Sequence, residues 1–264
     1  MITDSNVMEA MSLRKLAARL RRQGAALARL SRSAPTPVIV HRLRVLTRRM
    51  RAACGAGLRI TGDEAFRDLA KLLRRTGRTL GERRALDVAA ADYAAFSGGR
   101  THPDIERARA ATRAAVEKRL RPKKRAAAAE ALARAALALE AAAADLEPIE
   151  SHLRRRMARL RLLASAQSKE DLHALRVEVK KTRYALEILR TIGRGVPPEG
   201  ERELKRLQRT LGRVHDFEVL QSYLQAGDPV ARRAQSREQA LRDKAVRRIP
   251  AALRAAAATV ARID

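Results

Sequence analysis

Two stretches of eleven residues carry the same pattern of basic side chains: HRLRVLTRRMR begins at residue 41, and HALRVEVKKTR begins at residue 173. In each, a histidine is followed by lysine or arginine at the third, seventh and tenth positions after it. The matched residues are His41, Arg44, Arg48 and Arg51 in the first copy and His173, Arg176, Lys180 and Arg183 in the second. Arginine binds phosphate oxygens in bidentate fashion, lysine adds a point charge, and a neutral histidine donates one hydrogen bond. A row of such groups suits a ligand that carries many phosphates.

The spacing places these basic residues on one face of an α-helix. At about 100° per residue, the four basic positions of each copy fall within about 80° of one another, and apolar residues fall on the opposite face. The apolar residues are Leu43, Leu46 and Met50 in the first copy and Leu175, Val179, Leu186 and Leu189 in the second. Like charges at this spacing repel by about 0.2–0.5 kcal/mol per pair, and only Glu178 intervenes in either copy, away from the basic face. One such ridge could be a solvated helix face, but its recurrence favours an anion-binding site.

A second pair of similar segments extends the repeat. LLRRTGRTLGERRALDV, residues 72–88, aligns with ELKRLQRTLGRVHDFEV, residues 203–219, so that Leu80-Gly81 matches Leu211-Gly212. The aligned basic residues are Arg74, Arg75 and Arg78 in the first segment and Lys205, Arg206 and Arg209 in the second. Two blocks in the same order with nearly the same spacing predict that each half of the chain repeats one helical hairpin.

The composition supports a polyanionic partner. The 264 residues include 57 Lys and Arg against 29 Asp and Glu, which gives a formal charge of +28. The charge is spread over both halves and interleaved with apolar residues, as in a folded basic protein. Aromatic residues make up 2% of the chain, and Trp is absent, which weakens any function that stacks single-stranded bases. The single cysteine, Cys54, excludes an internal disulfide framework and a cysteine-based zinc site.

The rest of the chain predicts an all-α fold that positions the repeated helices. Ala, Leu, Arg and Glu dominate, and no stretch alternates with a period of two. Breaks are expected at residues 31–37, 54–57, 97–104, 122, 147–151, 193–198, 227–229 and 250. We expect one domain over residues 1–264, made of two repeat halves, 1–146 and 147–264. The repeat predicts that these halves are related by a pseudo-twofold axis and that their antiparallel helices pack two by two in a bundle.

The motifs resemble those of the CHAD family, the conserved histidine α-helical domain. The first copy reads H-x-x-R-V-x-x-R-R-x-R followed by L-G, and the second reads H-x-x-R-V-x-x-K-K-x-R-Y-x-x-E followed by L-G-x-x-x-D. The resemblance covers nearly the whole chain and is to a stand-alone member. It implies an all-helical fold of two pseudo-symmetric four-helix bundles with basic residues lining a central groove or pore. It also implies binding of inorganic polyphosphate and association with polyphosphate granules.

Carried over position by position, the resemblance assigns the ligand positions. These are His41, Arg44, Arg48, Arg49 and Arg51 in the first copy and His173, Arg176, Lys180, Lys181 and Arg183 in the second. The second helix of each hairpin is expected to add Arg74, Arg75, Arg78, Lys205, Arg206 and Arg209. We interpret Tyr184 and Glu187 as structural support for Arg183, one turn away, rather than as ligand contacts.

The chain departs from the family pattern at one acidic position. The residue is Asp216 in the second half but Ala85 in the first. If Asp216 orients a basic residue of the motif through a salt bridge, the first half-site should be looser or less selective. Asp87 is a candidate substitute, and the residues alone leave this question open.

Other functions receive less support from the residues. A DNA- or RNA-binding architectural protein is the main alternative, but a concentrated double ridge fits a thin phosphate chain better than a duplex. Carboxylate clusters and phosphate-cradling glycine motifs are absent from the sequence, so we expect no enzyme activity and no cofactor. We also expect no metal at His41 and His173, because a cation would enter a strongly positive groove. The expected protein is soluble, cytoplasmic and located on granules without membrane insertion, and sulfate or phosphate should also bind in the groove.

Overall fold

The computed structural model describes residues 4–142, 145–165, 167–225 and 227–263, and the prediction of an all-α fold is confirmed over this part of the chain. The helices there are α1 (Asp4–Leu30), α2 (Pro37–Thr61), α3 (Glu64–Ser97), α4 (Pro103–Arg119), α5 (Pro122–Ala141), α6 (Glu147–Leu162), α7 (Lys169–Thr191), α8 (Pro198–Gln221) and α9 (Ala231–Val260). None of these helices is both long and apolar enough to cross a membrane.

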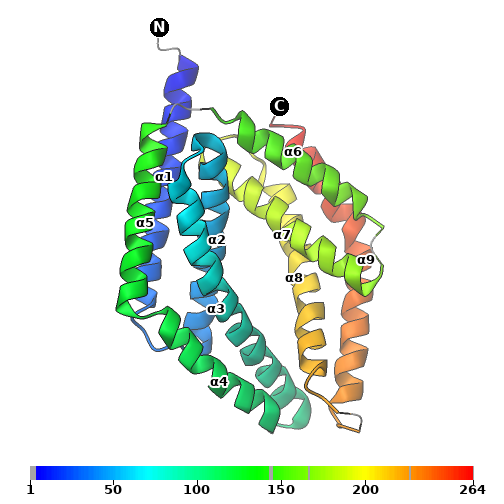
Figure 1. The fold of residues 1–264 in the computed structure, drawn as a ribbon. Helices are drawn as coiled ribbons and strands as arrows, with labels where there is room; N and C mark the ends of the chain where they lie inside the picture. Colours follow the sequence, from blue (N-terminus) through cyan, green and yellow to red (C-terminus); the bar gives the residue numbers. More distant parts are fainter. Residues whose placement is uncertain (1–3, 143–144, 166, 226, 264) are drawn as a thin grey trace.

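The helices form two groups that lie side by side (Figure 1). Helices α1 to α5 pack together in one group and α6 to α9 in the other. The groups meet where α3 contacts α8 and where α2 contacts α7. The two copies of the basic motif lie on α2 and α7, and the matched Leu-Gly segments lie on α3 and α8, which pack against α2 and α7 respectively. The fold therefore brings the repeated helices of both halves to the contact between the groups.

One hydrophobic cluster runs through both groups. It includes Leu20 and Phe66 from the first group and Leu186, Leu207 and Ile249 from the second, all of which are fully or almost fully buried. A fully buried side chain of this size contributes about 1.5–3 kcal/mol. The two groups thus share one packed core.

Two predicted breaks, at residues 54–57 and 250, fall inside helices because packing overrides local propensity. The break predicted at 147–151 is also wrong, because the chain breaks before α6, whose first turn contains Pro148. Helix α2 continues through residues 54–57 and ends only at Gly62, which adopts the left-handed conformation (φ 68°). A Cβ added to Gly57 would lie 2.2 Å from Cε1 of Phe66, so this glycine permits close packing of α2 on α3. Helix α9 continues through Pro250, whose neighbours Ile249 and Leu253 are buried against the second group. Their burial offsets the hydrogen bond that the proline removes.

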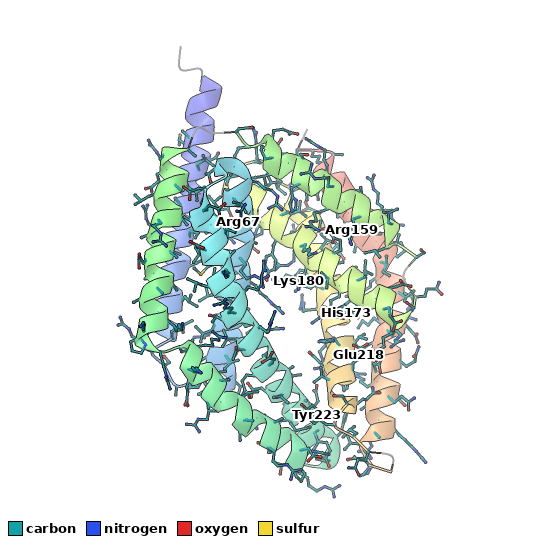
Figure 2. All side chains as sticks on the ribbon, in the orientation of Figure 1. Arg67, Arg159, His173, Lys180, Glu218 and Tyr223 are labelled. Carbon is teal, nitrogen blue, oxygen red and sulfur yellow. The ribbon has the colours of Figure 1, made fainter. Side chains whose placement is uncertain are left out.

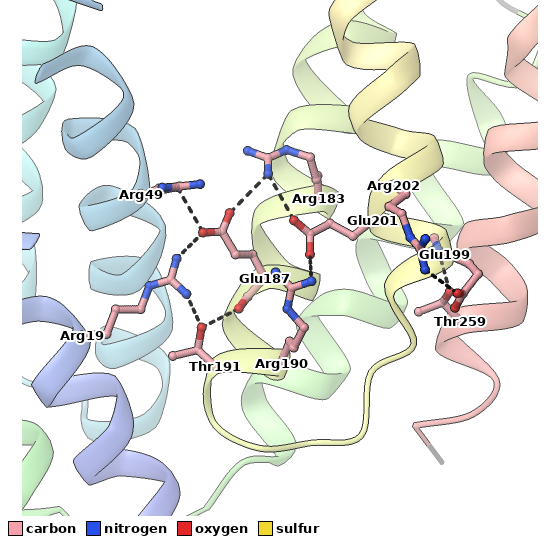
Figure 3. A network of polar contacts seen from close by, with 11 residues as sticks. Arg19, Arg49, Arg183, Glu187, Arg190, Thr191, Glu199, Glu201, Arg202 and Thr259 are labelled. Carbon is pink, nitrogen blue, oxygen red and sulfur yellow. Dashed lines mark hydrogen bonds and ion pairs between the residues drawn. The ribbon is translucent and has the colours of Figure 1, made fainter. Parts of the chain in front are cut away.

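Buried carboxylates each serve several basic residues. Glu187 on α7 pairs with Arg19 of α1, Arg49 of α2 and Arg183 of its own helix (Figure 3). Glu201 on α8 extends the network by accepting from Arg190 at 2.7 Å.

Two more carboxylates follow the same pattern. Glu178 lies 3.1 Å from Arg156, 3.8 Å from Arg159 and 3.9 Å from Lys181. In the first group, Asp87 lies 2.9 Å from Arg83 and 3.2 Å from Arg109. These shared ion pairs neutralise positive charge where helices pack together.

Candidate anion-binding site

A cavity of about 650 Å³ lies between the two groups of helices, and we refer to it as the central cavity. Eight basic side chains line it: Arg44 and Arg48 from α2, Arg84 from α3, Arg176 and Lys180 from α7, Arg209 and Arg213 from α8, and Lys244 from α9. Lys180 lies on the side of α7 that faces the space between the groups (Figure 2). Positive side chains from both halves of the chain therefore converge on one site.

The sequence of each motif helix explains this orientation. Helix α2 begins at Pro37, after the N-cap Thr36, whose side chain accepts a hydrogen bond from the backbone N–H of Ile39. Along α2, Leu43 and Met50 are buried, as the face assignment predicted, and Leu46 is half-buried. Burial of one face turns Arg44 and Arg48 toward the cavity on the other.

Helix α7 is oriented in the same way. Its N-cap is Ser168, whose side chain accepts from the backbone N–H of Asp171. Leu175 and Val179 are fully buried on the apolar face. Arg176 and Lys180 consequently face α2 and α8 across the cavity.

The two motif helices contribute Arg44, Arg48, Arg176 and Lys180 to the lining, and we call these four residues the inner cations. Their side chains form no ion pair with the residues that the structure describes. The Nε atom of Arg44 is buried and lacks a hydrogen-bond partner. Burial, and then the charges of Arg48 and Arg176, lower the pKa of Lys180 to about 8. The same two causes lower the pKa of Arg44 to about 9, at which it is still charged at neutral pH. A bound anion would relieve both the burial of these charges and their mutual repulsion.

The cavity has only two acidic side chains in its described lining, Glu82 and Asp216. Asp216 lies 3.3 Å from Arg213, which also forms a bidentate pair with Asp92 at 2.9 Å. Its hydrogen bond therefore goes to Arg213 and not to a basic residue of the motif helix. Burial lowers the pKa of both Arg44 and Arg176, and the charge of Asp216 partly offsets this lowering, so Asp216 influences both halves of the site.

Asp87 does not replace Asp216 in the first half. It lies two positions after Ala85, which is about 200° further round the helix. Its carboxylate is buried at the contact of α3 with α4, where it pairs with Arg83 and Arg109. Asp87 therefore does not take the role in the first half that Asp216 has in the second.

The histidines occupy different places. His41 lines the cavity, and burial, followed by the charges of Arg84, Arg44 and Arg48, lowers its pKa, so it is neutral at neutral pH and has one N–H to donate. His173 is exposed and lies outside the cavity lining, with its ring 5.9 Å from that of His215. His215 lines the cavity, and its Nδ1 lies 3.3 Å from Glu218. Within the described residues, no three His, Cys, Asp or Glu side chains are grouped as metal ligands would be.

Three residues that the resemblance assigned as ligands lie in ion pairs outside the cavity lining. Arg183 is buried, 3.2 Å from Glu187, and its guanidinium lies 4.2 Å from the centre of the Tyr184 ring. Arg49 lies 3.1 Å from the same Glu187 (Figure 3), and Lys181 is 3.9 Å from Glu178. The structural roles inferred for Glu187 and Tyr184 are thus matched by these contacts. Arg183 is turned away from the cavity because it stands at the edge of the basic face, where the carboxylate one turn later holds it.

The other assigned residues lie on the exterior, with the exception of Arg209, which lines the cavity. Those exposed outside the central cavity are Arg51, Arg74, Arg75, Arg78, Lys205 and Arg206. Burial and the charge of Arg74 lower the pKa of Arg51, so these two residues lie near each other on the first group. Arg206 pairs with Glu203.

Sequence reasoning missed Arg84, Arg213 and Lys244. Arg84 lies three positions after Gly81, on the same side of α3, so helical spacing from the Leu-Gly repeat could have found it. Arg213 follows Gly212 directly and becomes part of the wall through its pair with Asp92 of the other group. Lys244 lies on α9, which carries neither repeated motif, and no pattern in the sequence singles it out.

Comparisons with known proteins agree with this architecture. A family model described as the CHAD domain matches residues 13–225. The crystal structure of the CHAD domain from the plant Ricinus communis is similar to this chain with a TM-score of 0.60 and 21% sequence identity, covering 96% of this chain and 91% of that one. At this identity the likeness concerns the fold. A search of curated proteins found no match.

Proposed function

Because the chain belongs to the CHAD domain family, we propose that it binds inorganic polyphosphate in the central cavity. The observation that carries this proposal is the convergence of the inner cations, two from each half, without carboxylate partners among the described residues. Charge-assisted hydrogen bonds from arginine and lysine to phosphate oxygens would replace the missing partners.

The form of the cavity favours a chain of phosphates over a single one. Its basic residues come from five helices, so a ligand that contacts all of them must carry negative charge along its length. Polyphosphate has a charge on every unit and needs no base-stacking surface. Sulfate and free phosphate share the same chemistry and are expected to bind the same side chains more weakly, because each makes fewer contacts.

Nucleic acid remains the alternative partner, bound on the exterior. A volume of about 650 Å³ is typical of small-ligand cavities, which a duplex does not enter. Exposed residues such as Arg74 and Arg75 could still attract DNA through its phosphates without sequence preference. The two functions therefore predict different competition behaviour.

We expect long-chain polyphosphate to bind with sub-micromolar affinity at low salt and to stay bound in the presence of excess duplex DNA, RNA or ATP. About six phosphate contacts give a slope of roughly −4 for log K against log salt, or about a 250-fold loss of affinity between 50 and 200 mM salt. Fluorescence anisotropy with labelled polyphosphate measures both quantities. A flat salt response, or tighter binding of duplex DNA under the same conditions, would contradict the proposal.

We propose binding without catalysis, on polyphosphate granules in the cytoplasm. Of the two acids in the described lining, Asp216 is already engaged by Arg213, which leaves no free pair of carboxylates to hold a catalytic metal. Gel electrophoresis of the polyphosphate recovered from the binding experiment should show unchanged chain length. A fluorescent fusion that stays diffuse in cells with granules would count against the location.

Lys180 should make binding depend on pH. A bound polyanion favours its ammonium form and raises its pKa from about 8, so binding takes up a proton above that value. We expect affinity to fall up to about tenfold per pH unit as the pH rises beyond about 8, and Lys180→Arg to make this decrease shallower because a guanidinium has a higher intrinsic pKa than an ammonium group. Calorimetry near pH 9 in two buffers of different ionisation enthalpy measures the proton uptake. The same pH slope in Lys180→Arg would assign the effect to another group.

A further inference from the structure

A second, smaller cavity of about 270 Å³ adjoins the first between α8 and α9, and we call it the side groove. Its lining residues are Arg206, Arg209, Thr210, Lys244 and Arg248. Arg209, Thr210 and Lys244 also line the central cavity, so the two spaces adjoin along a shared wall.

The register of α8 and α9 arranges the side groove as two steps. Gly200 at the start of α8 donates to Oγ1 of Thr259 near the end of α9, and Gln221 at the end of α8 donates to Glu238. The helices are therefore antiparallel. Along α8, Arg206 lies about one turn beyond Arg209, and along α9, Arg248 lies about one turn beyond Lys244, in the same direction away from the central cavity. We call Arg206 and Arg248 the outer step.

Four of the five described side chains in the side groove are basic, and none is acidic. Among the described residues, Arg206 pairs with Glu203 at the outer step, whereas Arg209, Lys244 and Arg248 have no ion pair. Lys244 and Arg248 are four positions apart on α9, a spacing at which like charges repel and destabilise a helix. An acidic side chain would relieve this repulsion on a surface that binds no ligand, and the described lining of the groove has none.

We propose that the side groove is an exit subsite for the phosphate chain. A long polyphosphate leaves the central cavity between Arg209 and Lys244 and continues over Arg206 and Arg248. This inference rests on the proposed function and adds a determinant of ligand length. Chains too short to extend beyond the central cavity do not reach the outer step, so affinity continues to rise with chain length after that cavity is filled.

The test removes the outer step alone. Arg206 and Arg248 line only the side groove, so Arg206→Ala/Arg248→Ala leaves the central cavity intact. We expect tripolyphosphate to bind within about twofold of the original protein. Long-chain polyphosphate should bind about tenfold more weakly, with a salt slope shallower by about 1.4 because two contacts are lost. Calorimetry at several salt concentrations gives the affinity and the salt slope for tripolyphosphate and for long-chain polyphosphate.

Two further variants separate this effect from charge and from folding. Arg232→Ala/Arg247→Ala removes the same charge from α9 at exposed positions outside both cavities and should change neither probe's affinity. Arg248→Ala alone leaves the Arg206–Glu203 pair intact and should reduce the long-chain salt slope by about half as much. Equal losses for both probes, equal losses in the control pair, or full long-chain affinity in the groove variants would overturn the exit subsite. If the original protein binds neither probe, the proposed function itself fails.

Discussion

Removing two inner cations from either half of the chain is expected to lower the affinity for long-chain polyphosphate by at least about 100-fold at low salt. Hydrogen bonds between charged partners contribute about 1.5–3 kcal/mol each, so the loss of two amounts to about 3–6 kcal/mol. The variants are Arg44→Ala/Arg48→Ala on α2 and Arg176→Ala/Lys180→Ala on α7. Because both pairs line one cavity, each variant should lose affinity rather than half of its binding sites.

The matched control removes two arginines that the resemblance also assigned as ligands. Arg75 and Arg78 are exposed on α3 and lie outside the central cavity, so Arg75→Ala/Arg78→Ala should lower affinity by no more than about twofold through net charge alone. Calorimetry gives affinity and stoichiometry together. Half the stoichiometry with unchanged affinity in either cavity variant would show that the halves bind independently.

The two cavity variants should lose similar amounts. The sequence indicated a weaker first half, because Ala85 stands where the second half has Asp216. In the structure, the Asp216 carboxylate bonds to Arg213, and its charge acts on Arg44 as well as on Arg176. Asp216 therefore acts on both halves, and Ala85 gives the first half-site no specific defect.

Bound polyphosphate should stabilise the protein, and removal of one inner cation should stabilise the protein without ligand. Long-chain polyphosphate at about 1,000 times its Kd is expected to raise the free energy of unfolding by about 4 kcal/mol, or the melting temperature by roughly 8–16 °C. Lys180→Met should melt a few degrees higher than the original protein without ligand, by roughly 2–8 °C, and should gain less from polyphosphate. Scanning calorimetry at pH 7, with and without ligand, measures the four melting temperatures.

The sign of the substitution effect follows from the lowered pKa of Lys180. The folded protein holds this proton less tightly than the unfolded chain, so the charge is destabilising below about pH 8. The gain from Lys180→Met should be complete at pH 7 and disappear as the pH rises from about 8 to 10.5. A lower melting temperature for the unliganded variant would mean that Lys180 supports the fold and that the cavity is not strained by its own charge. Polyphosphate can also bind the unfolded basic chain. The change in melting temperature that it causes in Arg44→Ala/Arg48→Ala, which lacks two inner cations, measures this contribution.

The sequence predicted the central part of the site because each motif helix carries its own orientation signal. Leu43 and Met50 define a buried face on α2, and helical spacing then fixes where Arg44 and Arg48 point. No long-range information is needed for that step. The recurrence of the motif at His173 supplied the second wall of the cavity in the same way.

The errors arise where a partner distant in sequence decides the outcome. Arg49 and Arg183 match the ligand pattern, but Glu187 holds both in a network that also includes α1. Lys244 belongs to the site only because α9 packs against α8. Gly57 was read as a helix break, whereas the ring of Phe66 makes it a close-packing position. Helical periodicity describes one element at a time and contains no information on such contacts.

The shared carboxylates have a consequence for how this sequence can change over time. The chain has 57 Lys and Arg but 29 Asp and Glu, and Glu187 pairs with arginines on three helices. Loss of one arginine leaves the carboxylate with other partners, whereas loss of the carboxylate leaves Arg19 and Arg49 without an ion pair among the described residues and leaves Arg183 with Glu201 alone. Substitutions are therefore tolerated unequally within this network. Each arginine can be replaced singly, whereas replacement of Glu187 is expected to be selected against.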